Sequence, residues 1–138
     1  MSEENVEIVR RSFELVNEVG TDAFIGGNFW SDDWVFDPSG TGIPGLGVYR
    51  GHDEIRTFFE EDWFTTFPFE EWEIHISDLV DHGDRVIGIS HQQGRGASSG
   101  VAATLELANV FTLRDGPIVR VQLYRDRGEA LEAAGLQE

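Results

Sequence analysis

The chain has 138 residues and a formal net charge of -16, because 26 Asp and Glu residues stand against only 10 Lys and Arg residues. A chain of this length can form one domain with its own hydrophobic core, and we expect a single domain over residues 1–138. Such an acidic surface repels nucleic-acid phosphates and anionic lipids, which argues against both as partners. The sequence contains no Cys, which excludes disulfides and thiolate ligands for metals.

The sequence also indicates a location and a kind of ligand. No apolar run approaches the roughly 20 residues that span a bilayer, and the N-terminus lacks the pattern of a signal peptide. We therefore expect a soluble, cytoplasmic protein without a membrane partner. The 10 Phe and 4 Trp residues are enough to line a cavity for a small apolar molecule.

Three helices are predicted in the first half of the chain. Residues 3–19 repeat apolar side chains at three- and four-residue steps, as an amphipathic helix does. A short second helix is predicted over residues 21–29, and a third over residues 52–67. Between the last two, residues 34–37 predict a short strand that Pro38 ends, followed by a Gly-rich loop.

After Pro68 the apolar period changes from helical to two, which predicts consecutive strands joined by tight turns. Residues 126–129 then have the pattern of a capping box that opens a short final helix. Helices first and a meander of strands afterwards indicate an α+β fold with an antiparallel sheet. The strands are predicted at residues 72–77, 85–95, 101–113 and 118–125.

Asn109 is the most informative polar residue of these strands. It is the only polar residue among the odd positions of the strand over residues 101–113. One face of an antiparallel sheet packs inward, so we expect the amide in the interior, where an unpaired amide costs about 1–3 kcal/mol. Two interpretations stay open: a hydrogen bond to backbone or buried water, or a pocket group that binds a ligand oxygen.

Asp37 ends a strand beside Trp34 and Phe36, before a loop long enough to cover a cavity mouth. Strand ends beside such loops often carry chemistry. Desolvation by aromatic neighbours can raise the pKa of a carboxyl group and make it a proton shuttle near neutral pH. The alternative is a turn-forming Asp that bonds to the backbone after Pro38.

Other candidates carry weaker signals. His91 and Gln93 share a strand face with Arg95, so they are candidates for pocket-facing groups or for a polar strand edge. Trp34 and Trp63 are interpreted as core or pocket lining. The four His residues lack the spacing of metal sites, and no Ser–His–Asp set can be assembled. We therefore expect no metal and no cofactor.

The order of several segments resembles one known superfamily over roughly residues 3–136. The segments are "ENVEIVRRSFELVN", "SDDWVFDPSG", "YRGHDEIRTFF", "GDRVIGISHQQGRG", "LELANVFTLRDGPIVRVQLY" and "DRGEALEAAGL". Together they resemble the nuclear transport factor 2-like superfamily, specifically its SnoaL-like polyketide cyclase branch, and more distantly ketosteroid isomerase. The resemblance implies a cone of three N-terminal helices over a curved antiparallel sheet, a pocket inside the cone, and frequent homodimerisation through the sheet.

The resemblance also implies roles for individual residues. Asp37 falls where ketosteroid isomerase has its general base, Asn109 where it has a protonated aspartic acid, and Phe13 where it has the oxyanion-binding tyrosine. Because Phe13 cannot donate a hydrogen bond, efficient steroid isomerisation is not expected, and the SnoaL-like cyclases are the better match. The two carboxylates and arginine of a limonene epoxide hydrolase are not matched, because Asp37 and Arg95 lack a second carboxylate.

Three hypotheses follow for function. The first is a cofactor-independent isomerase, cyclase or lyase, in which Asp37 moves a proton of a small apolar carbonyl compound and Asn109 holds its oxygen. The second is a non-catalytic ligand-binding or dimeric interaction domain. The third is an epoxide-type hydrolase. The first requires Asp37 and Asn109 to open onto one cavity. The predicted substrate contacts are Phe13, Trp34, Trp63, His91, Gln93, Arg95 and Phe111.

Overall fold

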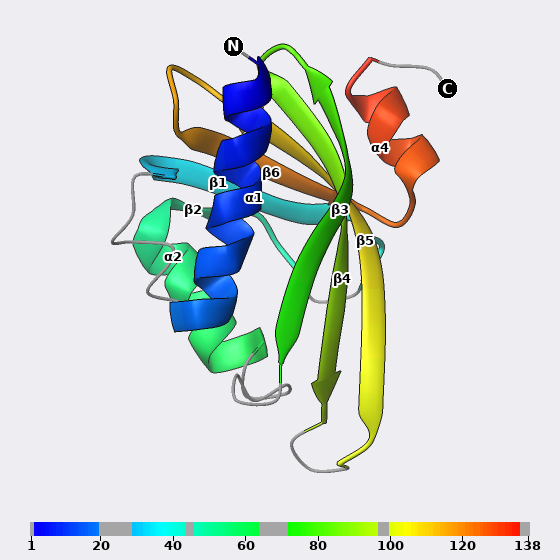
Figure 1. Ribbon diagram of the computed structural model, residues 1–138. Coiled ribbons are helices and arrows are strands. Elements are labelled where there is room, and N and C mark those ends of the chain that lie inside the picture. Colours follow the sequence, from blue (N-terminus) through cyan, green and yellow to red (C-terminus); the bar gives the residue numbers. More distant parts are fainter. Residues whose placement is uncertain (1, 20–28, 44–45, 64–71, 97–99, 136–138) are drawn as a thin grey trace.

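The computed structural model describes residues 2–19, 29–43, 46–63, 72–96 and 100–135, and shows helices packed on one curved sheet (Figure 1). The six strands lie in the order β2-β1-β6-β5-β4-β3, which confirms the predicted α+β class. The strands are β1 (Trp30–Gly40), β2 (Tyr49–Arg50), β3 (Glu73–His82), β4 (Arg85–Arg95), β5 (Ala102–Leu113) and β6 (Ile118–Tyr124). The helical elements are α1 (Ser2–Val19), α2 (Gly51–Thr57), the π-helix η2 (Phe58–Trp63) and α4 (Arg127–Ala133).

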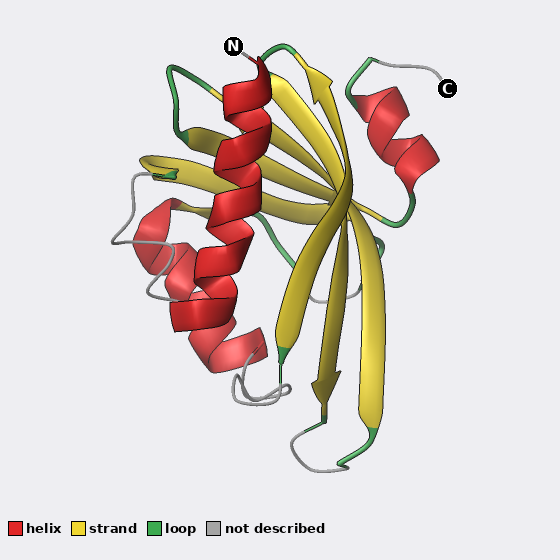
Figure 2. Ribbon diagram, viewed as in Figure 1, coloured by secondary structure: helices red, strands yellow, loops and turns green. Residues whose placement is uncertain are grey.

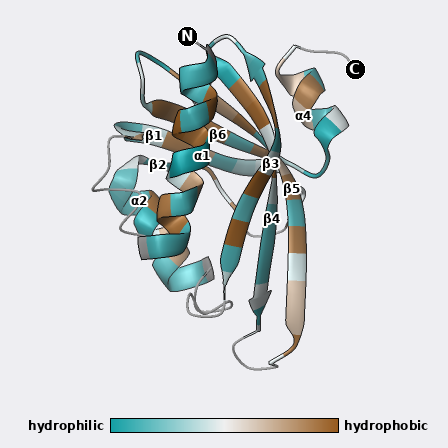
Figure 3. Cartoon of the chain, viewed as in Figure 1, coloured by the Kyte–Doolittle hydropathy of each residue, from teal (hydrophilic) through white to brown (hydrophobic). Residues whose placement is uncertain are grey.

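Helix α1 confirms the first predicted helix. Its residues Val9, Phe13 and Val16 are buried, while Glu14 and Glu18 are exposed. This division follows the helical period, and hydrophobic and hydrophilic bands alternate along α1 in Figure 3. The apolar side packs on β3 and β4. None of the helices in the described part of the chain is long and apolar enough to cross a membrane.

The third predicted helix differs in type over the residues that the structure describes. Helix α2 ends at Thr57 and continues as the π-helix η2, so a uniform α-helix over residues 52–67 is wrong. In η2 the neighbouring Phe58 and Phe59 both pack on Phe36, with ring centroids 5.9 and 5.5 Å away. The second predicted helix falls almost wholly on residues 20–28, which lie outside the described residues.

The sheet is mixed rather than antiparallel throughout. Strands β3 to β6 form the predicted antiparallel meander. Strand β1, however, pairs in parallel with β6, which places Asp37 opposite Gln122 and Phe36 opposite Val121. The alternation of apolar residues along a strand reports its two faces, but not the direction of its neighbour. The sequence pattern therefore could not have indicated this parallel pair.

Strand β1 is also longer than predicted. It continues through Pro38 to Gly40, so the prediction that Pro38 ends the strand is wrong. The register between β1 and β6 shifts between Asp37 and Gly40. A proline, which has no N–H to donate, is tolerated where a ladder is irregular in this way.

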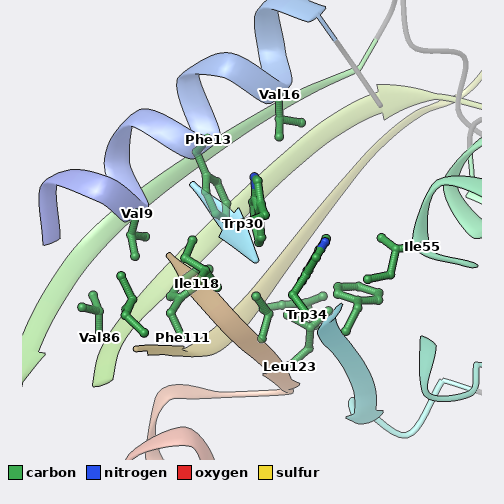
Figure 4. Packing of buried hydrophobic residues seen from close by; sticks show 14 of the residues in the cluster. Val9, Phe13, Val16, Trp30, Trp34, Ile55, Val86, Phe111, Ile118 and Leu123 are labelled. Carbon is green, nitrogen blue, oxygen red and sulfur yellow. The ribbon is translucent and has the colours of Figure 1, made fainter. Parts of the chain in front are cut away.

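The two faces of the sheet are covered by different helices (Figure 2). We call the face toward α1 the inner face and the face toward α4 the outer face. On the inner face, aromatic and aliphatic side chains from α1, β1, β5 and β6 form the main core (Figure 4). On the outer face, α4 packs on β4, β5 and β6. The smaller outer cluster consists of Ile87, Ile89, Ala108, Val110, Ala130 and Ala134.

Helix α4 begins at the cap that the sequence predicted. The Asp126 side chain accepts a hydrogen bond from the Glu129 backbone N–H at 2.9 Å, which satisfies one of the free N–H groups of the first turn. After the helix, Gly135 adopts a φ of 82°, a left-handed conformation that favours glycine. The predicted start and stop of the final helix are both confirmed.

Candidate functional site

A cavity lies between α1, η2 and the inner face of the sheet. It holds about 780 Å³ of empty space, including solvent at its open mouth. Eight aromatic residues line it: Phe13, Trp30, Trp34, Phe36, Phe58, Phe59, Trp72 and Phe111.

The aromatic walls come from elements that are distant in the sequence (Figure 4). Phe13 on α1 meets Phe111 on β5 edge to face, with ring centroids 5.6 Å apart. Trp30 and Trp34, both on β1, have ring centroids 4.1 Å apart. Aromatic side chains have few rotatable bonds, so such walls hold their shape when a ligand binds.

The segment after β1 forms part of the cavity wall, as the predicted loop over a cavity mouth requires. Thr41, Ile43 and Leu46 line the cavity. The Thr41 hydroxyl donates to the Pro38 carbonyl at 2.8 Å and accepts from the Ile43 N–H at 3.2 Å. Both bonds are local, so the Thr41 side chain serves mainly to hold this segment against the cavity.

Three further polar side chains face the cavity from neighbouring inner positions of β4 and β5. The Ser90 hydroxyl donates to the Leu107 carbonyl at 3.3 Å. The Gln92 carbonyl oxygen accepts from the Trp72 indole N–H at 3.1 Å. The Asn109 amide nitrogen donates to the carbonyls of Leu107 and Gly88, at 3.1 and 3.4 Å. Asn109 is therefore buried as predicted, and it is held by the backbone.

The cavity wall is uncharged wherever the structure describes it. None of the described lining residues is an Asp, Glu, Lys, Arg or His. A charged ligand would lose its hydration without gaining a partner of opposite charge, which is costly. The described wall consequently suits a neutral molecule.

Asp37 does not line this cavity. On β1 the residues on either side of it, Phe36 and Pro38, are the ones that face the cavity. Successive side chains of a strand point to opposite faces, so Asp37 lies on the outer face. The expectation that Asp37 and Asn109 open onto one cavity is therefore not met.

The Asp37 carboxylate is held by neighbours on the outer face. One oxygen accepts from the Ser39 N–H at 3.0 Å and from the Ser39 hydroxyl at 2.6 Å, and the other lies 3.4 Å from Arg120 Nη2. Burial, the largest single influence, raises the pKa of Asp37, but the Ser39 hydrogen bonds and the Arg120 charge together hold that pKa below its ordinary value. The expected rise of the pKa is not found, and the turn-forming alternative fits.

Comparison with known proteins agrees with this architecture. Residues 9–121 match the SnoaL-like domain family. The chain belongs to the SnoaL-like domain family. No curated protein has a significantly similar sequence.

Solved structures show the same fold at low sequence identity. TerC, co-crystallised with polyporic acid, is 23% identical, with a TM-score of 0.72 over 96% of this chain and 97% of TerC. A candidate SnoaL-like polyketide cyclase from Jannaschia sp. CCS1 is 18% identical, with a TM-score of 0.70 over 91% and 87% of the two chains. A Catenulispora acidiphila protein with a ketosteroid isomerase-like fold, in complex with trimethylamine, is 16% identical, with a TM-score of 0.70 over 94% and 93%.

The SnoaL-like domain brings some of the predicted contact residues together and separates others. Phe13, Trp34 and Phe111 line the cavity beside Asn109. The side chain of Trp63 lies outside the described residues. The roles predicted for these residues in binding a substrate stay predictions.

The polar candidates of β4 lie on the other face of the SnoaL-like sheet. His91 and Gln93 alternate with the cavity-lining Ser90 and Gln92, and Arg95 donates instead to the Gly100 carbonyl at 3.1 Å. Their placement in the pocket is wrong, because the apolar residues that share their face pack under α4 and not around the cavity. Arg95 is likewise not the arginine beside Asp37, since Arg120 occupies that place.

Sequence analysis missed Ser90 and Gln92. The register of β4 and β5 places Gly88 opposite Asn109, Ser90 opposite Leu107 and Gln92 opposite Leu105. Residues directly opposite each other share a face of the sheet. Combining the inward position of Asn109 with the hairpin register would therefore have identified both residues.

A serine–histidine–carboxylate set does exist in the structure, although none could be assembled from sequence. Ser77 Oγ lies 2.9 Å from His91 Nε2, and His91 Nδ1 lies 3.2 Å from Glu106 Oε2. The set lies on the outer face of β3, β4 and β5, where the side chains of His91 and Glu106 are 40% and 68% exposed. None of the three lines the cavity. We interpret the set as a solvated cross-strand network.

Proposed function

We propose that this SnoaL-like domain binds a neutral aromatic molecule in its inner cavity. The observation that carries the proposal is the cavity wall itself: eight aromatic side chains, a few oriented polar groups, and no charged side chain among the described lining residues. Small-molecule sites typically combine a mostly apolar wall with a small number of placed polar groups. The proposal is the second of the sequence hypotheses, made specific by the cavity.

A second candidate is a cyclase or isomerase, and the SnoaL-like family favours it. Asp37 is not favoured as its general base, because the carboxylate lies on the outer face in contact with Ser39 and Arg120. Catalysis at the described cavity would instead depend on folding a flexible substrate into a reactive shape, with Ser90, Gln92 and Asn109 as hydrogen-bonding groups. An epoxide-type hydrolase lacks an observation in its favour.

The test for binding compares two variants of adjacent residues on β5. Leu107 faces the cavity and Glu106 faces outward, so Leu107→Trp fills the cavity while Glu106→Trp adds the same indole on the surface. Aromatic phenols and ketones are titrated while thermal stability and tryptophan fluorescence are followed. We expect wild type and Glu106→Trp to bind and Leu107→Trp to lose at least tenfold in affinity. Equal binding by both variants would exclude this cavity as the site.

Turnover separates the binder from the enzyme. Polyketide-like substrates that cyclise are incubated with wild type and with Leu107→Trp, and products are followed by mass spectrometry. Binding with no product above the uncatalysed reaction supports the binding protein. Product formation that Leu107→Trp abolishes supports the cyclase.

We also propose that the protein forms a homodimer through the sheet. The family resemblance supports it. Light scattering after size exclusion tests it, because a mass near the 15.5 kDa of one chain would contradict a dimer.

A further inference from the structure

The amide of Asn109 has only one orientation that the surrounding backbone permits. Its nitrogen lies 3.1 Å from the Leu107 carbonyl oxygen and 3.4 Å from the Gly88 carbonyl oxygen. Both neighbours accept hydrogen bonds and cannot donate them. Rotating the amide by half a turn would place its oxygen against two other oxygens. The nitrogen therefore faces the backbone, and this assignment does not depend on where hydrogens are placed.

The consequence is that Asn109 presents an acceptor to the cavity. The amide nitrogen lies within hydrogen-bond distance of two backbone carbonyls, so the oxygen is left for the cavity that the residue lines. Within the described part of the chain, no donor to this oxygen is found. Asn109 is only 3% exposed, and a buried acceptor gains most from a ligand that donates to it.

The hydrogen-bonding roles of Ser90 and Gln92 are fixed by their neighbours in the same way. The Ser90 proton goes to the Leu107 carbonyl, so the lone pairs of its oxygen are directed elsewhere. The Trp72 indole can only donate, so it fixes the Gln92 oxygen toward itself and leaves the Gln92 amide nitrogen as a donor. The inner wall thus offers an acceptor at Asn109, another at Ser90, and a donor at Gln92.

We propose that Asn109 selects ligands that carry a hydroxyl or N–H group, and that the natural ligand is a neutral hydroxylated aromatic molecule. The proposal rests on the proposed function and specifies its ligand class. Its polarity is opposite to the role that the resemblance to ketosteroid isomerase implies, in which this position donates to an oxygen of the substrate. A carbonyl oxygen at Asn109 would face another acceptor, whereas a phenol or enol would donate to it. A cation would also donate, but the described wall carries no charge to stabilise it.

Three matched probes test the inference by isothermal titration. Naphthol can donate a hydrogen bond, its methyl ether cannot, and naphthalene has no polar group. We expect wild type to bind naphthol about tenfold more tightly than the methyl ether, the usual effect of one buried hydrogen bond. In Asn109→Leu, which keeps the branched shape and removes the acceptor, we expect naphthol and its ether to bind about equally. Thr112→Val is the control, since Thr112 lies on the outer face of β5 and does not line the cavity, so the loss of its hydroxyl leaves the tenfold preference in place.

The outcomes distinguish this inference from the proposed function. If none of the three probes binds, the proposed function fails and this inference fails with it. If all three bind wild type with similar affinity, or if Asn109→Leu keeps the preference for naphthol, the cavity binds aromatic molecules but Asn109 does not select donors.

A measurement on the wild-type protein covers the case in which Asn109→Leu does not fold. Nuclear magnetic resonance follows the side-chain amide of Asn109 without any ligand. Because its nitrogen faces two backbone carbonyls and not the cavity, we expect slow exchange with solvent and no loss of protection when naphthol binds. Rapid exchange of these hydrogens would show that the nitrogen faces the cavity, and would overturn the inference.

Discussion

The inner and outer faces of strands β4 and β5 carry different kinds of polar side chain. On the inner face, Ser90, Gln92 and Asn109 are uncharged and lie among aromatic rings. On the outer face, one residue away along each strand, His91 and Glu106 form an ionisable pair in contact with solvent. Because a charge is stable in water and costly in an apolar cavity, the alternation of the strand keeps ionisable groups away from the cavity.

The reactive side chains and the candidate ligand site lie on opposite faces of the sheet. The residues with the most reactive side chains, Asp37 and His91, lie outside, and the candidate ligand site consists of groups that cannot ionise near neutral pH. Selectivity at such a site would come from shape and from the direction of each hydrogen bond, as proposed for Asn109. If the inner face holds the core and the candidate ligand site, substitutions there should have larger effects than substitutions on the outer face.

The largest effect is expected on the inner face, from Phe111→Ala. Phe111 is fully buried and packs edge to face on Phe13, so its removal leaves a void between α1 and β5. We expect a loss of about 3–5 kcal/mol in the free energy of unfolding, measured by urea denaturation. The neighbouring Thr112→Ala, on the outer face, is the control and should cost less than about 1 kcal/mol. Equal losses for the two variants would contradict the conclusion that the main core lies on the inner face.

An intermediate effect is expected on the outer face, from Asp37→Asn. The folded pKa of Asp37 lies below its ordinary value, so its charge stabilises the fold above the unfolded pKa of about 3.9, and that contribution is lost as the pH falls through the lower folded value. We expect a loss of about 0.5–1 kcal/mol at pH 7, because the Arg120 side chain is 45% exposed, and a smaller difference from wild type at pH 3.

Binding measurements on the same variant decide the function of Asp37. Asp37→Asn should bind aromatic probes as wild type does, because Asp37 does not line the cavity. Arg120→Gln removes the other half of the ion pair but leaves the Ser39 hydrogen bonds, so it should show a smaller loss of stability at pH 7, without a change in binding. A loss of binding or turnover in Asp37→Asn alone, with stability unchanged, would return Asp37 to the role first predicted for it.

The sequence predicted the structure correctly where an element has a single apolar side. Helix α1 was predicted because its apolar residues follow the helical period and nothing interrupts them. Asn109 was placed correctly because only one face of β5 is continuously apolar. Strand β5 therefore has one clear inward face, and Asn109 is the polar residue on that face.

Strand β4 shows why the rest could not be predicted. It carries buried apolar residues on both faces, Val86 toward the inner core and Ile87 and Ile89 toward α4. Alternation alone cannot tell which of two buried faces borders a cavity, because that depends on where α4 packs. The same limit applies to Asp37. Its aromatic neighbours Trp34 and Phe36 were recognised from the sequence, but they point to the inner face, whereas Asp37 lies on the outer face.

The smallest effect is expected from Ser77→Ala, which removes the hydroxyl from the outer Ser77–His91–Glu106 network. Water replaces the lost hydrogen bond at the partly exposed His91, so the free energy of unfolding should change by less than about 0.5 kcal/mol. We also expect that a fluorophosphonate probe does not label wild type. A working nucleophile needs donors placed to stabilise the developing oxyanion and a site that excludes water, and a network whose histidine and glutamate are 40% and 68% exposed does not exclude water. Stoichiometric labelling of wild type that disappears in Ser77→Ala would contradict this, and would mean that the outer face carries a catalytic site of its own.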